Sequence, residues 1–347
     1  MGVLLFFRIK CVFLQSIADM AAGIIKNLFR IWLPNAGVLM SLTILFDYLK
    51  CVMIVLMIVF HLAYFGDMYP VAKKFVYTFH MPAFLLLSGY LANTSKSLTG
   101  IGRSLLWLVV PYAVMEAGYT VMASLLPIRE HIAELTLPVF SDKLLLHPIG
   151  PYWFIHTLVL LEALCYAIMR FVKPAAEAVL IFVFVCWLLS LPGVGLIAFS
   201  NALYFIAGAA LRRGGADLLS VFASSSPLTA VPLALLCLDS GNFDRAIPAG
   251  AAITWLVISL LLYLYRYIRP GCRVLLYIGR HTLVILLFSP IFTLLAKALV
   301  PLFAFDPTAL SFMVVAVAFV LVGCFALARL LDIIGISRWL MGKDKTV

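Results

Sequence analysis

The chain has 347 residues, of which 65% are hydrophobic and only 12% are charged, and its formal net charge is +10. Soluble domains carry roughly 25% charged residues, and apolar runs recur here along the whole length, so a soluble domain with one anchor is excluded. Backbone polar groups in lipid must be satisfied internally, and continuous rather than alternating apolar runs exclude a closed barrel. We therefore expect an all-α polytopic membrane protein with about ten transmembrane helices.

Two compositional features have simple explanations. A basic chain can indicate nucleic-acid binding, but basic residues also collect in cytoplasmic loops by the positive-inside rule, which we favour. The seven cysteines lie mostly in apolar runs or at their ends, without a CxxC motif, and we interpret them as packing residues. No HExxH, GxSxG or GxxxxGK[ST] motif is present, and nothing in the sequence indicates a metal site.

Ten apolar segments are candidates for membrane spans. They lie at about 42–65, 75–94, 104–125, 151–171, 176–192, 196–211, 218–238, 248–268, 274–300 and 308–331. The third and the ninth contain Pro111 and Pro290, which can kink a membrane helix without ending it.

Residues 1–39 precede these spans and differ from them. No clean span of about twenty apolar residues is present. The short apolar runs contain Arg8, Lys10, Lys26 and Arg30 and are interrupted by Asp19, Pro34 and Asn35. A cleaved signal peptide fits poorly because a long apolar span follows at once. Two alternatives stay open: a basic interfacial helix, or translation of the native protein from Met40. We treat 1–39 as an extension, 40–335 as the membrane domain and 336–347 as a basic cytoplasmic tail.

The first span contains FDYLKCVMIVLMIVFH, which places Asp47, Lys50 and His61 on an otherwise apolar segment. On a helix Lys50 and His61 are about three turns apart, on one face and roughly 16 Å from each other along the axis. Asp47 lies one turn before Lys50 on a similar face. Ionisable groups inside a membrane helix are costly and usually face a site or a cavity.

The second span opens with FHMPAFLLLSGYL, in which His80 lies near the same end as His61. The two histidines can converge on one cavity, or His80 can be an interfacial histidine bonded to backbone. Ser88 and Gly89, deeper in the span, would let a neighbouring helix approach closely.

Two carboxylates, Glu116 and Glu162, fall near the middle of the third and fourth spans. Buried carboxylates must pair, accept hydrogen bonds or stay protonated, so Glu116 can orient a histidine, pair with Lys50 or join two helices. The connection 126–150 is the longest polar segment. It is either a lid over a substrate site or a solvated linker.

The basic residues set the expected orientation. One side of the membrane would hold Lys96, Arg103, Arg170, Lys173, Arg212, Arg213, Arg266, Arg269, Arg273, Arg280, Arg329, Arg338, Lys343 and Lys345. The other side would hold Lys73, Lys74, Arg129, Lys143, Arg245 and Lys297. The positive-inside rule then places both termini in the cytoplasm, with Lys50 near the inner end of the first span and His61 near the outer end. Lys96, Arg103 and Arg280 on the inner side are candidates for binding phosphates of a nucleotide-like donor.

These segments together resemble integral-membrane acyltransferase family 3, and within it the fucose 4-O-acetylase-like branch. FDYLKCVMIVLMIVFH and FHMPAFLLLSGYL are similar to the family's first two spans, and GPYWFIHTL and LLYIGRHTLVILL resemble two later ones. The resemblance covers about residues 40–335 and favours a start shortly before Asp47. Three positions depart from the family: Gly100 stands where many members have an arginine, and Leu286 and Ser289 stand where many have tyrosine and histidine.

The resemblance implies an O-acyltransferase of a bacterial cytoplasmic membrane. The donor would be acyl-CoA, most simply acetyl-CoA, with no tightly bound cofactor, and the acceptor a sugar hydroxyl of a surface polysaccharide or its lipid-linked precursor. His61 would act as general base or transient acyl carrier, Lys50 would bind donor phosphate or the developing oxyanion, and Asp47 would hold Lys50. His80 and Glu116 are secondary candidates.

Two other classes compete with this interpretation. A transporter or flippase suits the number of spans and the intramembrane charges, although no inverted repeat or pair of broken spans is visible. A non-catalytic scaffold of a glycan-assembly complex is the third class, kept open by the departures at Gly100 and Ser289.

Overall fold

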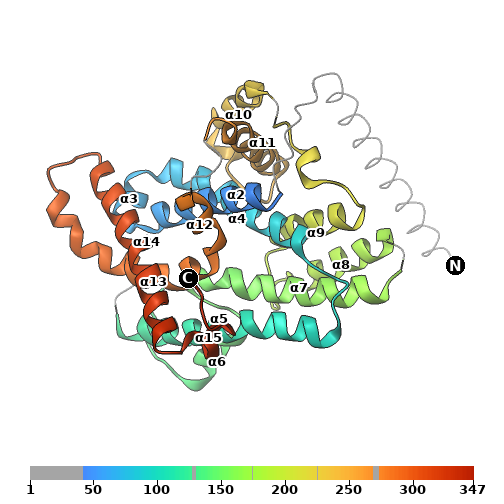
Figure 1. The fold of residues 1–347 in the computed structure, drawn as a ribbon, viewed down its shortest axis with the longest axis horizontal. Coiled ribbons are helices and arrows are strands. Elements are labelled where there is room, and N and C mark those ends of the chain that lie inside the picture. Colours follow the sequence, from blue (N-terminus) through green and yellow to red (C-terminus); the bar gives the residue numbers. More distant parts are fainter. Residues whose placement is uncertain (1–41, 127–129, 174, 225, 269–272) are drawn as a thin grey trace.

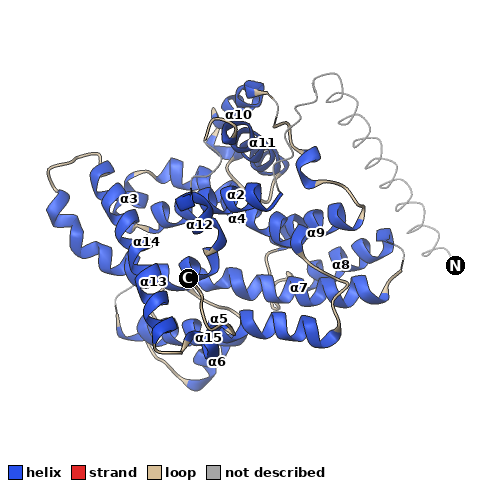
Figure 2. Cartoon of the chain, in the orientation of Figure 1, coloured by secondary structure: helices blue, strands red, loops and turns tan. Residues whose placement is uncertain are grey.

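The computed structural model describes residues 42–126, 130–173, 175–224, 226–268 and 273–347. Over these residues the chain is built from helices and connecting loops, with no strand (Figure 2). This confirms the predicted all-α class. The expectations for residues 1–39, an interfacial helix or a later start, lie outside the described residues.

The α-helices follow one another along the chain with these bounds. They are α2 (Leu42–His61), α3 (Ala63–Met68), α4 (Pro70–Leu91), α5 (Leu98–Leu125), α6 (Leu137–Leu145), α7 (Trp153–Phe171), α8 (Ala175–Leu189), α9 (Phe199–Arg213), α10 (Ala230–Cys237), α11 (Pro248–Tyr265), α12 (Arg273–Arg280), α13 (Thr282–Leu295), α14 (Leu310–Ile333) and α15 (Ser337–Met341). Short 3-10 turns are η1 (Gly150–Tyr152), η2 (Leu218–Val221), η3 (Pro227–Thr229), η4 (Ser240–Asn242) and η5 (Ala296–Phe303).

Six helical segments in the described part are long and apolar enough to cross a membrane. They are Leu42–His61, Leu98–Leu125, Gly150–Phe171, Pro248–Tyr265, Thr282–Phe303 and Leu310–Ile333. The protein is therefore a polytopic helical membrane protein. The total of ten spans and the cytoplasmic position of the termini stay predictions.

The other four predicted spans fold into helices that are shorter or more polar. Helices α8 and α9 have 15 residues each, about 22 Å at 1.5 Å per residue, which is less than the hydrocarbon core of about 30 Å. Helix α10 has 8 residues. Helix α4 is long enough, with 22 residues, but Lys73 and Lys74 lie near its start.

Helix α2 lies at the centre of the fold, as Figure 1 shows, and contacts α4, α11, α12, α13 and α14. Its central position explains why apolar residues occur on every side of it. Met53, Ile54 and Ile58 are among the most buried residues of the protein. An all-round apolar helix is the kind that is buried within a larger helical bundle.

Close packing of α4 against α9 depends on two glycines. A Cβ on Gly89 would lie 1.9 Å from the carbonyl oxygen of Phe205, and one on Gly208 would lie 2.0 Å from that of Leu86. Such contacts are impossible, so both positions require glycine for the two backbones to meet. The predicted role of Gly89 is confirmed, and α9 is the neighbour it admits.

Proline and polar residues shape the helices as their chemistry predicts. Pro111 and Pro290 both lie inside helices, α5 and α13, without ending them. Helix α5 begins where the Ser97 side chain accepts a hydrogen bond from the backbone N–H of Gly100 at 3.1 Å, which satisfies a donor left open at a helix start. Two predicted spans are interrupted: the chain leaves α2 at Leu62, and His281 separates α12 from α13.

Candidate active site

His61 is the last residue of α2, and its side chain is exposed although most of that helix is buried. Its Nδ1 lies 2.7 Å from the backbone carbonyl oxygen of Met57. A carbonyl only accepts, so Nδ1 carries the hydrogen and Nε2 of the neutral ring keeps its lone pair. The backbone of α2 thus fixes the tautomer that a general base or nucleophile requires.

His61 lines a cavity of about 450 Å³, which we call the His61 cavity. The walls come from the end of α2, the start of α4, α5, the turn at Gly150 and the junction of α13 with η5. Besides His61, the polar side chains in its lining are Asp67, Lys73, Tyr77, Tyr119, Glu130, Ser289, Thr293 and Lys297. The volume lies within the range of small-molecule sites.

His80 does not line this cavity with His61. It is 2% exposed, and its Nδ1 bonds to the carbonyl oxygen of Val76 at 2.8 Å. The Tyr77 ring contacts both histidines, with centroids 5.8 Å from His61 and 5.1 Å from His80. His80 is bonded to backbone, as the second alternative expected, but it is buried rather than interfacial, and it is absent from the lining of the His61 cavity. Tyr77 is the aromatic group that connects the pair.

Glu116 is fully buried in α5, and its Oε1 accepts a hydrogen bond from the backbone N–H of Ile149 at 2.8 Å. The next amide, that of Gly150, donates to Glu130 Oε2 at 2.6 Å. Two carboxylates therefore hold successive amides of the turn that forms one wall of the His61 cavity. Glu116 could have contacted Lys50 or a histidine, but it bonds to the backbone of Ile149 instead. Its second oxygen, Oε2, has no hydrogen-bond partner among the described residues.

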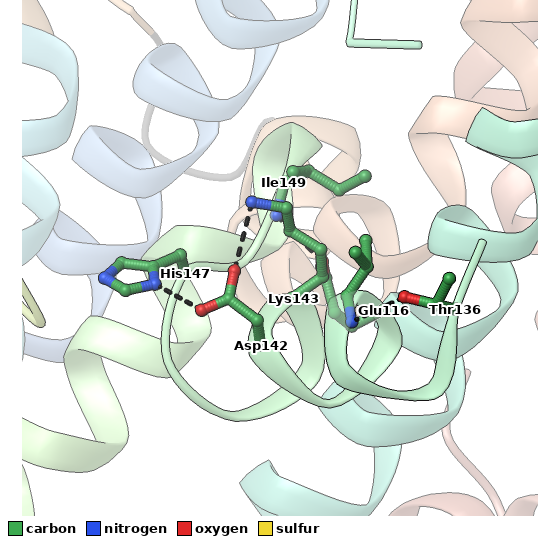
Figure 3. Close-up of polar contacts among 7 residues, drawn as sticks. Glu116, Thr136, Asp142, Lys143, His147 and Ile149 are labelled. Carbon is green, nitrogen blue, oxygen red and sulfur yellow. Dashed lines mark hydrogen bonds and ion pairs between the residues drawn. The ribbon is translucent and has the colours of Figure 1, made fainter. Parts of the chain in front are cut away.

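The polar connection 126–150 is folded against the helices over its described residues. Tyr112 donates to the carbonyl oxygen of Leu144 at 2.8 Å, and His156 Nε2 lies 3.0 Å from that of Leu145. Asp142 contacts His147 at 2.7 Å and Lys143 at 3.2 Å, and Figure 3 shows both side chains directed at the Asp142 carboxylate. The hydrogen bond from His147, together with Lys143, holds the pKa of the Asp142 carboxyl below its usual range.

At the other end of α2, Asp47 binds two cations. Its Oδ1 lies 2.8 Å from Lys50 Nζ, and its Oδ2 accepts from Arg280 Nε at 2.9 Å. The carboxylate is 3% exposed, whereas the Arg280 side chain is 58% exposed. Gly279 makes this contact possible, because a Cβ there would lie 1.8 Å from the Asp47 carbonyl oxygen. We call Asp47, Lys50 and Arg280 the Asp47 cluster.

The predicted pairing of Asp47 with Lys50 is thus present, and Arg280 joins it from α12. Among the described residues, Lys96 and Arg103 form no bond with the Asp47 cluster. Lys96 Nζ donates to Ser104 Oγ at 2.7 Å, and Arg103 is exposed on α5.

Several polar residues of the His61 cavity were missed as site residues from the sequence, among them Lys73 and Tyr77. Lys73 was counted only as a charge on the predicted outer side, yet it lies in the cavity wall and pairs with Asp67 at 3.3 Å. Tyr77 was not among the predicted site residues. Its position three residues before His80, one helical turn, was the available signal.

The described residues contain no group of three or more His, Cys, Asp or Glu side chains that could hold a metal ion. Cys51, Cys165, Cys186 and Cys324 are buried in the interior, which agrees with their interpretation as packing residues.

Comparison with known proteins identifies the family. No curated protein and no solved structure matches the chain significantly. Residues 44–329, far more than half of the chain, match the acyltransferase 3 family model, which is described as an acyltransferase domain. The match begins at α2, ends within α14 and includes His61, the Asp47 cluster and the cavity walls. This polytopic membrane protein therefore belongs to the acyltransferase 3 family.

Proposed function

We propose that the protein is a membrane O-acyltransferase that moves an acyl group from acyl-CoA, most simply acetyl-CoA, to a sugar hydroxyl. The acceptor is a surface polysaccharide or its lipid-linked precursor on the His61 side. Family membership supports acyl transfer over the transporter and scaffold alternatives. The fucose 4-O-acetylase-like branch, suggested by the sequence motifs, is part of this proposal.

One observation carries the assignment of the reactive group. His61 presents a ring whose Nδ1 is engaged by Met57, so Nε2 is the nitrogen available to take a proton. The ring lines a cavity with Lys73, Tyr77, Glu130 and other polar groups, which suit a hydroxyl-rich ligand. Histidine is the side chain most often used for proton transfer near neutral pH.

The reaction balances with His61 as base. Nε2 takes the hydroxyl proton while the sugar oxygen bonds to the thioester carbonyl carbon, and a tetrahedral intermediate forms. The carbon–sulfur bond then breaks, and the proton passes to the departing CoA thiolate. In the carrier variant, Nε2 first attacks the thioester carbonyl carbon, and the carbon–sulfur bond breaks to release the CoA thiolate. The sugar hydroxyl then attacks the acyl group on Nε2, the carbon–nitrogen bond breaks, and the hydroxyl proton passes by way of the freed ring to the thiolate.

The Asp47 cluster is the proposed donor end. Asp47 uses one oxygen for each cation, so the exposed Arg280 guanidinium keeps nitrogen atoms for a donor phosphate. Lys50 is a further contact for the donor phosphates, and so are Lys96 and Arg103. Lys50 and His61 are roughly 16 Å apart along α2, so the acyl group must be delivered along this helix.

His80 and Glu116 act as positioning residues in this proposal. His80 packs on Tyr77 beside the cavity, and Glu116 holds the turn at Ile149. The protein would reside in the bacterial cytoplasmic membrane, with acyl-CoA and a glycan as its partners, alone or within a glycan-assembly complex, and with no nucleic acid.

Labelled acetyl-CoA supplied to membranes that contain the protein tests this function. We expect label in a glycan as a base-labile ester, and its loss in His61→Ala at an unchanged amount of folded protein. His147→Ala is the matched control, because His147 lies outside the His61 cavity lining. Equal labelling by His61→Ala and the wild type would contradict the assignment.

A further inference from the structure

A second cavity of about 510 Å³ adjoins the His61 cavity. The two share Asp67, Lys73 and Tyr77 in their walls. The far wall comes from the segment before α11, which contributes Phe243, Asp244 and Arg245. We call this the basic cavity, because Lys73, Lys74 and Arg245 line it.

Among the described residues, Lys74 and Arg245 form no ion pair with a carboxylate, although Asp244 lines the same cavity. Arg245 is half-buried, its guanidinium lies 5.4 Å from the centre of the Trp153 ring, and burial lowers its pKa. Lys74 is exposed and donates to the carbonyl oxygen of Ser240 at 2.8 Å, which leaves two of its three N–H groups. By contrast, Lys73 is paired with Asp67, and Asp244 accepts from the backbone N–H of Ala246.

The backbone around Arg245 is held in place. Tyr204 of α9 donates to the carbonyl oxygen of Arg245 at 2.9 Å, and a Cβ on Gly250 would lie 1.9 Å from the carbonyl oxygen of Asp244. The segment is therefore packed tightly against the start of α11. An arginine fixed in this way, with a desolvated guanidinium, is suited to bidentate recognition of an anion.

A third cavity, of about 540 Å³, continues from the basic cavity and shares Pro70 and Phe243 with it. Its remaining walls are largely apolar and include Met68, Val71 and Phe75. Val71 is 60% exposed, so an apolar surface lies open next to a positively charged one.

We propose that the three adjoining cavities form one extended acceptor site for a sugar carried on a phosphate-bearing lipid. The phosphate binds Lys74 and Arg245, the first part of the hydrocarbon chain lies in the apolar cavity, and the sugar reaches His61. This inference rests on the proposed function and specifies its acceptor. An acidic polysaccharide would use the basic cavity alone, whereas a lipid phosphate accounts for both the charge and the apolar wall beside it.

Binding can be measured without turnover on the purified full-length protein in a phosphate-free maltoside detergent. The probes are tritiated farnesyl diphosphate, farnesol and inorganic diphosphate. We expect farnesyl diphosphate to bind at least about tenfold more tightly than either fragment, and Lys74→Gln and Arg245→Gln each to weaken it about tenfold or more. Lys143→Gln, a charge loss outside all three cavities, should leave the affinity unchanged.

Each outcome bears on the lipid phosphate subsite separately from the proposed reaction. His61→Ala should bind farnesyl diphosphate like the wild type, so intact binding without acyl transfer would leave the subsite standing. Equal binding by the Lys74→Gln/Arg245→Gln double variant, or by farnesol, would overturn it. So would inorganic diphosphate or an acidic oligosaccharide binding as tightly as the lipid diphosphate. Should Arg245→Gln unfold, Lys74→Gln alone tests the same charge at an exposed position.

Discussion

Replacing Asp47 with asparagine tests whether the Asp47 cluster positions the donor. The change keeps the shape of the side chain but removes the charge that holds Lys50 at 2.8 Å and Arg280 at 2.9 Å. A hydrogen bond to a charged group contributes about 1.5–3 kcal/mol, and breaking a fully buried ion pair costs about 3–5 kcal/mol. Because Lys50 is 22% and Arg280 58% exposed, both cations regain water, and we expect a total loss of about 1–3 kcal/mol.

The assay for Asp47→Asn combines thermal unfolding in detergent with the KM for acetyl-CoA. We expect a lower Tm and a KM raised by roughly tenfold, since about 1.4 kcal/mol of lost donor binding corresponds to a factor of ten. The KM for the acceptor should change much less, because the His61 cavity is at the opposite end of α2. An unchanged Tm together with an unchanged donor KM would refute the role assigned to Asp47.

Three further predictions concern the packing of α4 against α9, the Tyr77 contacts and the polar connection 126–150. Gly89→Ala and Gly208→Ala should each abolish or severely reduce the amount of folded protein in membranes, because α4 and α9 would have to separate. The control Gly118→Ala has open space around it and should be neutral or slightly stabilising. Equal yields for all three variants would show that α4 and α9 do not depend on this close packing. Tyr77→Phe should keep the ring contacts with both histidines, and loss of the hydroxyl bond to Phe60 should lower the free energy of unfolding by only about 0.5–1.5 kcal/mol. Tyr77→Ala should reduce acyl transfer much more than Tyr77→Phe does. Equal losses of acyl transfer in the two variants would refute the role of Tyr77 as an aromatic contact. Because the pKa of Asp142 is lowered in the folded protein, its carboxylate stabilises the fold at pH values above the ordinary carboxyl pKa. This stabilisation is lost as the pH falls through the pKa of Asp142 in the folded protein. Limited proteolysis should therefore cut Asp142→Asn faster than the wild type at pH 7, and the difference should vanish in strong acid.

The sequence was sufficient for features that depend on local composition. Helix α2 follows from its apolar run, and the pairing of Asp47 with Lys50 follows from their spacing of one turn. The role of Gly89 could be anticipated because a small residue in a membrane helix admits a neighbour. The family resemblance also came from these short segments, and the match over residues 44–329 bears it out at family level.

Features that depend on long-range packing could not be predicted in the same way. Arg280 reaches Asp47 across 233 positions of sequence, and nothing local distinguishes it from the other basic residues near helix ends. The burial of His80 and the position of Tyr77 between the two histidines depend on how α4 packs against α2. The breaks at Leu62 and His281 could not be predicted either, since both positions lie inside predicted spans, 42–65 and 274–300.

We propose that Nε2 of His61 performs the chemistry of acyl transfer. Imidazole rescue tests it most directly: purified His61→Ala is supplied with labelled acetyl-CoA and acceptor, and transfer is followed as imidazole is added. A cavity of about 450 Å³ has room for imidazole beside a sugar. We predict negligible transfer without imidazole and a concentration-dependent return of activity with it, while His147→Ala behaves like the wild type throughout. Transfer by folded His61→Ala at the wild-type rate in the absence of imidazole would show that another group performs the chemistry.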